Sequence, residues 1–224
     1  MRRIETYPYS ICPLSGETID EDLWNYRTHL VGLILSVFGF FYLIYSFFSI
    51  NNNPLLFGII LYGLSQIFLF AASTVYHKQV NIKNKSVWRI VDHISIFFSL
   101  SGTFSPFVLG PFANFFGLEM FALLWSLAFI GSYLKIYYFE RFLPYSLISY
   151  LTMAAVFVLQ FILLKDLIPF SSLIYGIMGA LNLLFAIGFF LWDKLPYNHT
   201  IWHIFVMVSA IFNFRSIYDL LSSY

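Results

Sequence analysis

The sequence contains little charge. Only 10% of its 224 residues are Asp, Glu, Lys or Arg, whereas 60% are hydrophobic and 22% are aromatic. Soluble domains usually carry about 25% charged residues, so this composition excludes an ordinary water-soluble domain. The formal net charge is only +1 and the basic residues form no stripe, which excludes a nucleic-acid-binding surface.

The sequence also has little cysteine, and it lacks an apolar run at its start. Cys12 is the single cysteine, so no internal disulfide can form. Residues 1–24 contain neither the apolar core nor the cleavage site of a secretory signal peptide. We therefore expect an uncleaved chain in which residues 1–29 form a short cytoplasmic tail and residues 30–224 form the membrane domain.

Long apolar stretches are abundant instead. A spanning helix needs about 20 mostly apolar residues, and seven stretches meet this requirement. They run from Leu30 to Ile50, Pro54 to Tyr76, Ile90 to Leu109, Phe115 to Leu134, Leu143 to Leu164, Ile168 to Trp192 and His199 to Leu221. The sequence thus predicts an all-α polytopic membrane protein with seven transmembrane helices.

The Lys and Arg residues predict the orientation, because basic loops stay in the cytoplasm. Most of the 12 basic residues fall in the N-terminal tail or in loops after even-numbered spans, namely Arg2, Arg3, Arg27, Lys78, Lys83, Lys85, Arg89, Lys135, Arg141 and Lys194. Lys165 and Arg215 fall on the other side. We expect a cytoplasmic N-terminus, an outside C-terminus and a location in the plasma (inner) membrane.

This orientation places all five histidines near the cytoplasmic ends of the spans: His29, His77, His93, His199 and His203. Ionisable residues inside a membrane are costly and mark functional sites. Asp92 lies at the same level. The common depth of these residues indicates a buried metal site.

His199 and His203 are four residues apart, so both imidazoles lie on one helical face. Such a pair supplies two nitrogens to Zn²⁺, and His77 is the best third ligand from its depth. Three protein ligands leave a fourth position for water, as in catalytic zinc sites. Ser73, on the same face as His77, would then stabilise an oxyanion, and Asp92 would act as a base.

Each of these residues also has a simpler interpretation. An H-x3-H pair occurs on many helices without a metal. His29 and His93 fit helix-end residues that bond to backbone or loops. Asp92 fits a residue that neutralises Arg89 or caps its helix, and Ser73 fits a hydroxyl bonded to its own helix.

Four segments together resemble the hemolysin III and progestin/adipoQ receptor (PAQR) family. Trp88 to Leu109 (WRIVDHISIFFSLSGTFSPFVL) is similar to the family's third-helix signature. Ser73 to His77 is similar to its S-x3-H motif, His199 to Val206 to its H-x3-H motif, and Asn25 to Gly32 to the start of its first helix. The short tail resembles the bacterial hemolysin III branch more than the animal receptors.

The resemblance implies a seven-helix bundle with an inward N-terminus and zinc held by His77, His199 and His203. It also implies that Asp92 and Ser73 act at the zinc site and that the substrate is a ceramide-like lipid amide. The chain departs from the family at Asn213, at Ala154 with Ala155, and at Phe185, none of which is an expected zinc ligand.

Three functions remain open at this point. The first is a zinc-dependent hydrolase of a membrane-lipid amide. The second is a receptor or sensor of membrane homeostasis in which zinc is structural. The third is a cytolysin or transporter. Membrane lipid is the expected partner in each case, and the sequence predicts no nucleic-acid partner and no soluble protein partner.

Overall fold

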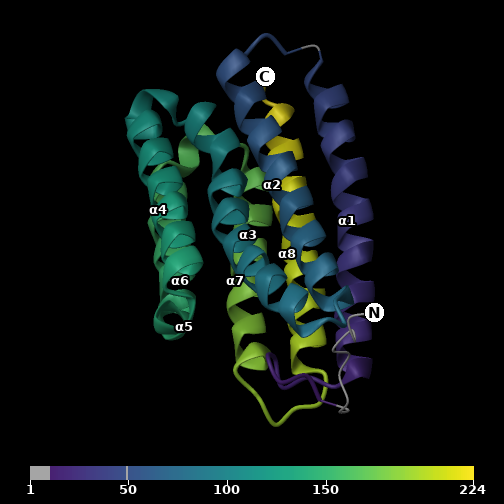
Figure 1. Ribbon diagram of the computed structural model, residues 1–224. Helices are drawn as coiled ribbons and strands as arrows, with labels where there is room; N and C mark the ends of the chain where they lie inside the picture. The colour runs from purple at the N-terminus through teal and green to yellow at the C-terminus, as the bar shows by residue number, and fades with distance from the viewer. Residues whose placement is uncertain (1–10, 49) are drawn as a thin grey trace.

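The computed structural model describes residues 11–48 and 50–224, so the predicted cytoplasmic residues Arg2 and Arg3 lie outside the described part. The described residues form helices and loops, with one isolated antiparallel bridge between Ile11 and Thr18 (Figure 1). The helices are α1 (Ile19–Phe47), α2 (Asn53–Lys78), α3 (Ile82–Leu109), α4 (Leu118–Tyr137), the short α5 (Phe139–Phe142), α6 (Ser146–Leu163), α7 (Phe170–Phe190) and α8 (Asn198–Leu221).

The long helices confirm the predicted membrane architecture. Six of the helices in the described residues are long and apolar enough to cross a membrane, namely all the long ones except α3. Helix α3 has 28 residues, which is also sufficient length. Its hydropathy is lowered by Asp92, His93 and a series of small polar residues in its second half. The protein is therefore an all-α polytopic membrane protein.

The small residues of α3 allow close packing against α2. A Cβ atom added at Gly102 of α3 would lie 2.0 Å from the Ser65 hydroxyl oxygen of α2, and one added at Gly58 of α2 would lie 2.7 Å from the Ser105 carbonyl oxygen. Small residues at helix interfaces let backbones approach closely within a membrane. The polar second half of α3 is buried between α2 and α4 and does not face lipid.

Helix α1 begins at Ile19, well before the predicted span at Leu30. Thr18 caps the helix by accepting a hydrogen bond from the backbone N–H of Glu21, and the Glu21 carboxylate accepts one from the N–H of Thr18. This reciprocal pair is a capping box, and Asp20 to Asp22 favour the positive end of the helix dipole. The extension carries Asp22, Asn25 and His29 into the bundle, where all three are buried.

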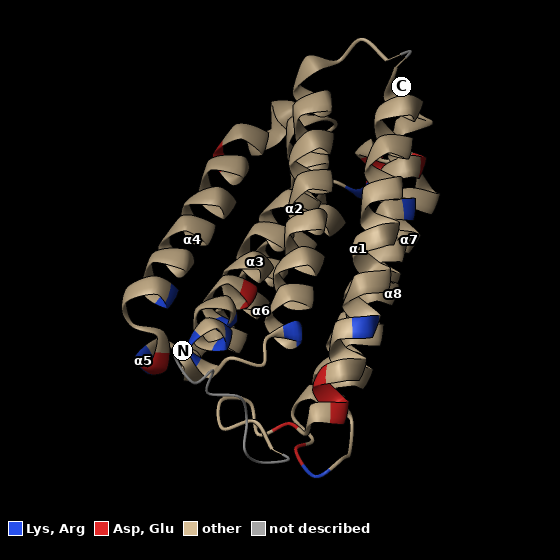
Figure 2. Cartoon of the chain, turned by 45° about the vertical axis from the view of Figure 1, so that its right-hand side comes forward, with Lys and Arg blue, Asp and Glu red and all other residues tan. Residues whose placement is uncertain are grey.

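The helices stand roughly side by side, with α4 and α6 at one edge and α1 at the other (Figure 1). Helix α2 packs against α1 and α3, and α8 packs against α1 and α7. Most charged residues gather at the end that carries α5 and the α7–α8 loop (Figure 2). This is the end that the basic residues assign to the cytoplasm, and we call it the cytoplasmic end.

Candidate metal centre

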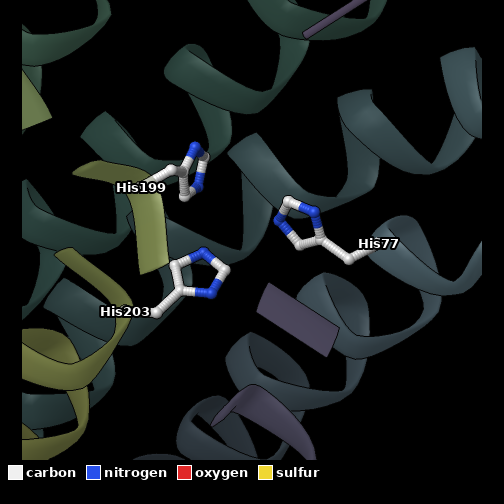
Figure 3. A group of neighbouring side chains, drawn as sticks. All are labelled: His77, His199 and His203. Carbon is white, nitrogen blue, oxygen red and sulfur yellow. The ribbon is translucent and has the colours of Figure 1, made fainter. Parts of the chain in front are cut away.

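Three histidines converge at the cytoplasmic end from two helices. His77 lies in the last turn of α2, whereas His199 and His203 occupy the first turns of α8. The ring centroid of His77 lies 5.2 Å from that of His199 and 5.0 Å from that of His203, and the latter two rings are 4.5 Å apart. The ring of His77 faces the other two across a shared space (Figure 3).

One ring nitrogen of each of these histidines lies within 4.8 Å of the others, a grouping that could hold a metal ion. His77 and His203 are buried, and the side chain of His199 is 27% exposed. Imidazole nitrogens suit zinc, copper, iron and nickel. The arrangement therefore supplies three ligands of the kind that transition metals use, close to the cytoplasmic surface.

The Nδ1 atom of each ring contacts an oxygen from residues 17–25. His77 Nδ1 lies 2.8 Å from Asp22 Oδ1, and His199 Nδ1 lies 2.8 Å from Glu17 Oε1. His203 Nδ1 lies 3.3 Å from the carbonyl oxygen of Asn25. Metal-binding histidines typically donate their second ring N–H to such an acceptor, which fixes the tautomer and the ring orientation. These contacts leave Nε2 of each ring as the atom for a metal.

A buried atom without a partner supports this assignment. His77 Nε2 is buried and has no hydrogen-bond partner, whereas the Nδ1 atom of the same ring contacts Asp22. A ring that donates from Nδ1 carries its lone pair on Nε2. The donor set and this unshared lone pair fit a divalent transition metal.

A second group could also hold a metal ion, formed by Glu17, Asp22 and His77. However, Asp22 Oδ2 already lies 2.6 Å from the buried Lys85 ammonium, which neutralises one carboxylate of this set. The Nδ1 atom of His77 and one oxygen of Glu17 are also engaged in the contacts described above. The three-histidine group is therefore the better metal site.

Glu17 remains ionised beside these rings. Burial by itself raises the pKa of Glu17, but the neighbouring His199, and to a smaller extent His77, more than offset this effect. The net pKa lies below the ordinary value of 4.5. The Asn25 side-chain amide donates a hydrogen bond of 3.1 Å to Glu17 Oε1, and the Thr200 hydroxyl donates one to Asn25 Oδ1.

Ser73 and Asp92 lie next to this group. Ser73 is one turn before His77 on α2, and its hydroxyl oxygen is buried without a hydrogen-bond partner. The interpretation of Ser73 as a hydroxyl bonded to its own helix is therefore wrong. Asp92 interacts electrostatically with His199, and its carboxyl group neighbours the Ser73 hydroxyl. A serine and a carboxyl group thus adjoin the three histidines.

The two alternative roles of Asp92 also fail. Helix α3 begins at Ile82 and is capped by Asn81, so Asp92 lies well inside the helix and does not cap it. Arg89 instead approaches the Glu140 carboxylate, at 3.7 Å. The neighbours of the Asp92 carboxyl group are instead Ser73 and His199.

His29 and His93 do not behave as helix-end residues bonded to backbone or loops. The His29 ring stacks on His203 with centroids 3.6 Å apart, and neither of its nitrogens has a hydrogen-bond partner. His93 lies away from the three-histidine group, and its Nδ1 is 3.0 Å from Lys135 Nζ. Four of the five histidines therefore cluster, and the fifth belongs to a separate network.

Residues 17–25 are the part of the centre that the sequence analysis missed. Residues 1–29 are predicted to form a tail, whereas Glu17, Asp22 and Asn25 contact the three rings. The signal for a helix start was present as the T-x-x-E pattern from Thr18 to Glu21. A helix from that point places Asp22, Asn25 and His29 at i, i+3 and i+7, which is one face.

An apolar cavity of about 500 Å³ adjoins the centre between α1, α2 and α8. At the cytoplasmic end it is lined by Gly32, Phe70 and Met207. Gly32 follows His29 by about one turn, and Met207 follows His203 by about one turn. The Phe70 ring contacts the His29 ring edge-on, with centroids 5.2 Å apart. Phe70 therefore links the cavity lining to His29, and neither His29 nor His203 lines the cavity itself.

The fold and the site together define a class: a multi-pass helical membrane protein with a buried histidine cluster that could hold a metal ion at its cytoplasmic end. The family model described as "Haemolysin-III related" matches residues 17–214. The chain belongs to this family, as its sequence motifs predict. The match begins at Glu17, whose carboxylate contacts the His199 ring.

Individual relatives agree with the family assignment. The chain is 32% identical to a hemolysin-3 homolog of Bacillus subtilis (strain 168), over 85% of this chain and 89% of that protein. It is 31% identical to hemolysin-3 of Bacillus cereus, over 84% and 86%. It is 27% identical to the human monocyte to macrophage differentiation factor, over 72% and 69%. The bacterial relatives favour the plasma (inner) membrane as its location.

Proposed function

We propose that this protein is a zinc-dependent hydrolase that cleaves the amide bond of a ceramide-like membrane lipid. The observation that carries this proposal is the group of three histidines with an apolar cavity of about 500 Å³ nearby, whose lining residue Phe70 contacts His29. Ligand sites typically enclose about 300–1,000 Å³ of mostly apolar space with a few polar groups at one end. An acyl chain that fills this cavity reaches Phe70, whose ring contacts His29 of the cluster.

His77, His199 and His203 are the proposed zinc ligands. Three nitrogen ligands and an open position are typical of catalytic zinc sites. When bound, zinc supplies a Lewis acid that polarises a carbonyl oxygen and makes water acidic enough to act as a nucleophile near neutral pH. The remaining steps fall to residues of the chain.

Asp92 is the proposed general base and acid. It accepts a proton from the water whose oxygen attacks the amide carbon, and it then passes this proton to the nitrogen as the C–N bond breaks. The products are a fatty acid and an amine. Ser73 has a buried hydroxyl without a partner, and it donates a hydrogen bond to the carbonyl oxygen as negative charge develops there.

Fatty-acid release by the purified, zinc-loaded protein tests this function. Wild-type protein in detergent should release fatty acid from an N-acyl sphingosine. The Asp92→Ala variant should lose about 10²- to 10⁴-fold in rate, the range of general acid–base catalysis, while its zinc content stays unchanged. Glu140→Ala is the matched control, because that carboxylate is exposed and pairs with Arg89. Equal rates for wild type and Asp92→Ala would remove the mechanism.

Structural zinc in a receptor or sensor is the second candidate for the same cluster. The contacts of residues 17–25 with the rings favour it, because a metal that joins α2 to α8 also fixes the rings that this third segment contacts. Bound metal stabilises the folded state by about 2.7 kcal/mol at a free concentration of one hundred times Kd. Chelation should then lower the melting temperature of a protein that hydrolyses no lipid.

The third candidate is a cytolysin, which the names of the Bacillus relatives suggest, or a transporter. A pore usually has polar side chains along several spans. In the described residues, the Asn182 amide instead donates to Ser209 and to the Phe205 carbonyl, and the Gln66 amide donates to Ser99 and Thr103. These amides join helices and do not line a pore, which argues against the cytolysin. Release of dye from liposomes containing the pure protein would favour the cytolysin.

A further inference from the structure

A second cavity, of about 170 Å³, lies at the cytoplasmic end of the bundle. It is formed by the segment before α1, the first turns of α3 and the short helix α5. Its apolar lining residues are Leu14, Val87, Ile90 and Phe139, and Arg89 and Glu140 also line it. Sites that enclose a whole ligand typically measure about 300–1,000 Å³. The smaller volume suits one polar group of a ligand whose remaining part lies outside the cavity.

Arg89 is the basic residue of this lining, and its charge is weakly neutralised. Its guanidinium carbon lies 5.0 Å from the ring centroid of Phe139, and its side chain is 20% exposed. Its Nη1 atom lies 3.7 Å from Glu140 Oε1, which is longer than a hydrogen bond, and the Glu140 side chain is 79% exposed. Exposed ion pairs contribute little. The planar guanidinium is therefore available to an anion, and it matches a phosphate group that accepts two parallel hydrogen bonds.

A buried lysine adds positive charge near the cavity. The Lys135 ammonium lies 4.7 Å from the same Phe139 centroid, and it donates to the His93 ring and the Ser146 hydroxyl. Neither partner supplies a negative charge, and Arg89 and Lys135 repel one another. Lys135 is fully buried, so it does not contact a ligand itself. The field of the two cations nevertheless favours an anion in the cavity.

The depth of the cavity indicates which anion it takes. Arg89 directly precedes the predicted span from Ile90 to Leu109, so it lies at the level of the inner headgroups. The cytoplasmic leaflet carries anionic lipids, and basic pockets between helices on that side bind their headgroups. A soluble anion would leave the apolar lining uncovered, including Val87, which is 57% exposed. The basic residues at this end also set the orientation, but orientation requires no cavity.

We propose that this cavity binds the phosphate group of an anionic phospholipid from the cytoplasmic leaflet. Arg89 donates hydrogen bonds to the phosphate oxygens, and Leu14, Val87 and Ile90 contact the glycerol and the first methylene groups of the chains. The Glu140 carboxylate competes for Arg89 and moves aside when the lipid binds, as its exposure allows. The inference is independent of the proposed hydrolase, because none of the four clustered histidines lines this cavity.

Lipid titration of the purified protein tests the inference. Protein in uncharged detergent micelles is titrated with a short-chain phosphatidylglycerol and, separately, with a phosphatidylcholine of the same chain length. The rise in melting temperature gives each apparent Kd. Phosphatidylglycerol should bind about fivefold more tightly, the effect of one basic residue near an anionic lipid. Equal affinity for the two lipids would overturn the inference.

Two substitutions break the same ion pair and should have opposite effects on lipid binding. Arg89→Gln removes the donor, so the affinity for phosphatidylglycerol should fall about 10-fold, the loss of one hydrogen bond to a charged group. Glu140→Gln removes the competing carboxylate, so the affinity should rise about threefold, within the range of an exposed ion pair. A fall in both variants would mean that the pair merely stabilises the fold, and it would overturn the inference.

Arg141→Gln is the matched control, because Arg141 is an exposed arginine of the same short helix that does not line the cavity. It should retain nearly all of the affinity for phosphatidylglycerol. A loss equal to that of Arg89→Gln would show a general attraction of surface charge and contradict a site at Arg89. If Arg89→Gln does not fold, the wild-type lipid pair and the gain in Glu140→Gln decide the question.

Inorganic phosphate distinguishes the lipid from a free anion. A tenfold excess of phosphate over phosphatidylglycerol, at constant ionic strength, should leave the apparent Kd of the lipid within twofold of its value without phosphate. Phosphate that raises the melting temperature as much as the lipid does, and displaces it, would overturn the assignment to a phospholipid.

Discussion

Two clusters of buried polar side chains lie toward the cytoplasmic end of the bundle, and they differ in what they leave unbonded. The lysine cluster consists of His93, Lys135, Ser146 and Tyr150, from α3, α4 and α6. Lys135 donates to His93 Nδ1 and to the Ser146 hydroxyl, and the Tyr150 hydroxyl donates to the His93 carbonyl oxygen. In the described structure, none of its side chains has a buried polar atom without a partner.

The histidine cluster consists of His29, His77, His199 and His203, from α1, α2 and α8. Here His77 Nε2 and both nitrogens of His29 are buried without partners, as is the hydroxyl of the adjacent Ser73. Unsatisfied buried groups are rare and each needs an explanation. Buried polarity alone therefore does not identify a site. A network whose polar atoms all have hydrogen-bond partners holds helices together. A network with unbonded lone pairs can instead bind a ligand.

Removing a ring from each cluster should give the largest contrast. His77→Ala and His199→Ala should each lower the zinc content from about one ion per chain to nearly none, because two nitrogens hold zinc poorly. His93→Gln, in the lysine cluster, should keep the full content. Metal analysis of the purified proteins measures all three. Full zinc content in His77→Ala would mean that the metal lies elsewhere.

The carboxylates that contact the histidine rings give a second test of the histidine cluster. Glu17→Gln exchanges the charged acceptor of His199 for a neutral amide of the same size. Changes to such supporting partners typically cost 10- to 100-fold in metal affinity, and we expect a loss in this range by competition with a chelating dye. Glu21→Gln is the control, since its carboxylate bonds to Thr18 and to the Tyr197 N–H. Equal losses in both variants would point to a general effect of charge.

The sequence predicts the fold well because the bilayer makes strong demands on composition. All seven spans were found from apolar length, and most boundaries fall within a few residues of the helices. The error at α1 has a physical cause. Its first turns are polar, so hydropathy placed the span at Leu30, although the helix begins at Ile19. The cap from Thr18 and Glu21, not apolarity, determines where that helix starts.

The site was predictable only in part, for a similar reason. Motif spacing and depth brought together His77, His199 and His203, because a bundle aligns helix ends at one level. Depth could not distinguish His29 from His93, which face different neighbours across the bundle. Nor could it assign Asp22 to His77, because that contact depends on the rotation of α1 about its axis.

Loss of one hydrogen bond in the lysine cluster should affect stability and leave metal binding unchanged. Ser146→Ala removes the hydroxyl that accepts from Lys135. A hydrogen bond to a charged group contributes about 1.5–3 kcal/mol, so thermal unfolding in detergent should show a loss of about that size. Zinc affinity should remain that of wild type. A coupled loss of affinity would show that the two clusters are not independent.

The smallest effect concerns the outermost support of the histidine cluster. The Thr200 hydroxyl donates to Asn25 Oδ1, which turns the amide nitrogen of Asn25 toward Glu17, and Glu17 holds His199. Thr200→Val keeps the shape but removes the donor, so the Asn25 amide is free to turn over. Since one net hydrogen bond is worth about 1 kcal/mol and acts here through two intermediates, we expect zinc affinity to fall by only about threefold. A loss as large as that of Glu17→Gln would mean that the orientation of Asn25, rather than the charge of Glu17, controls His199.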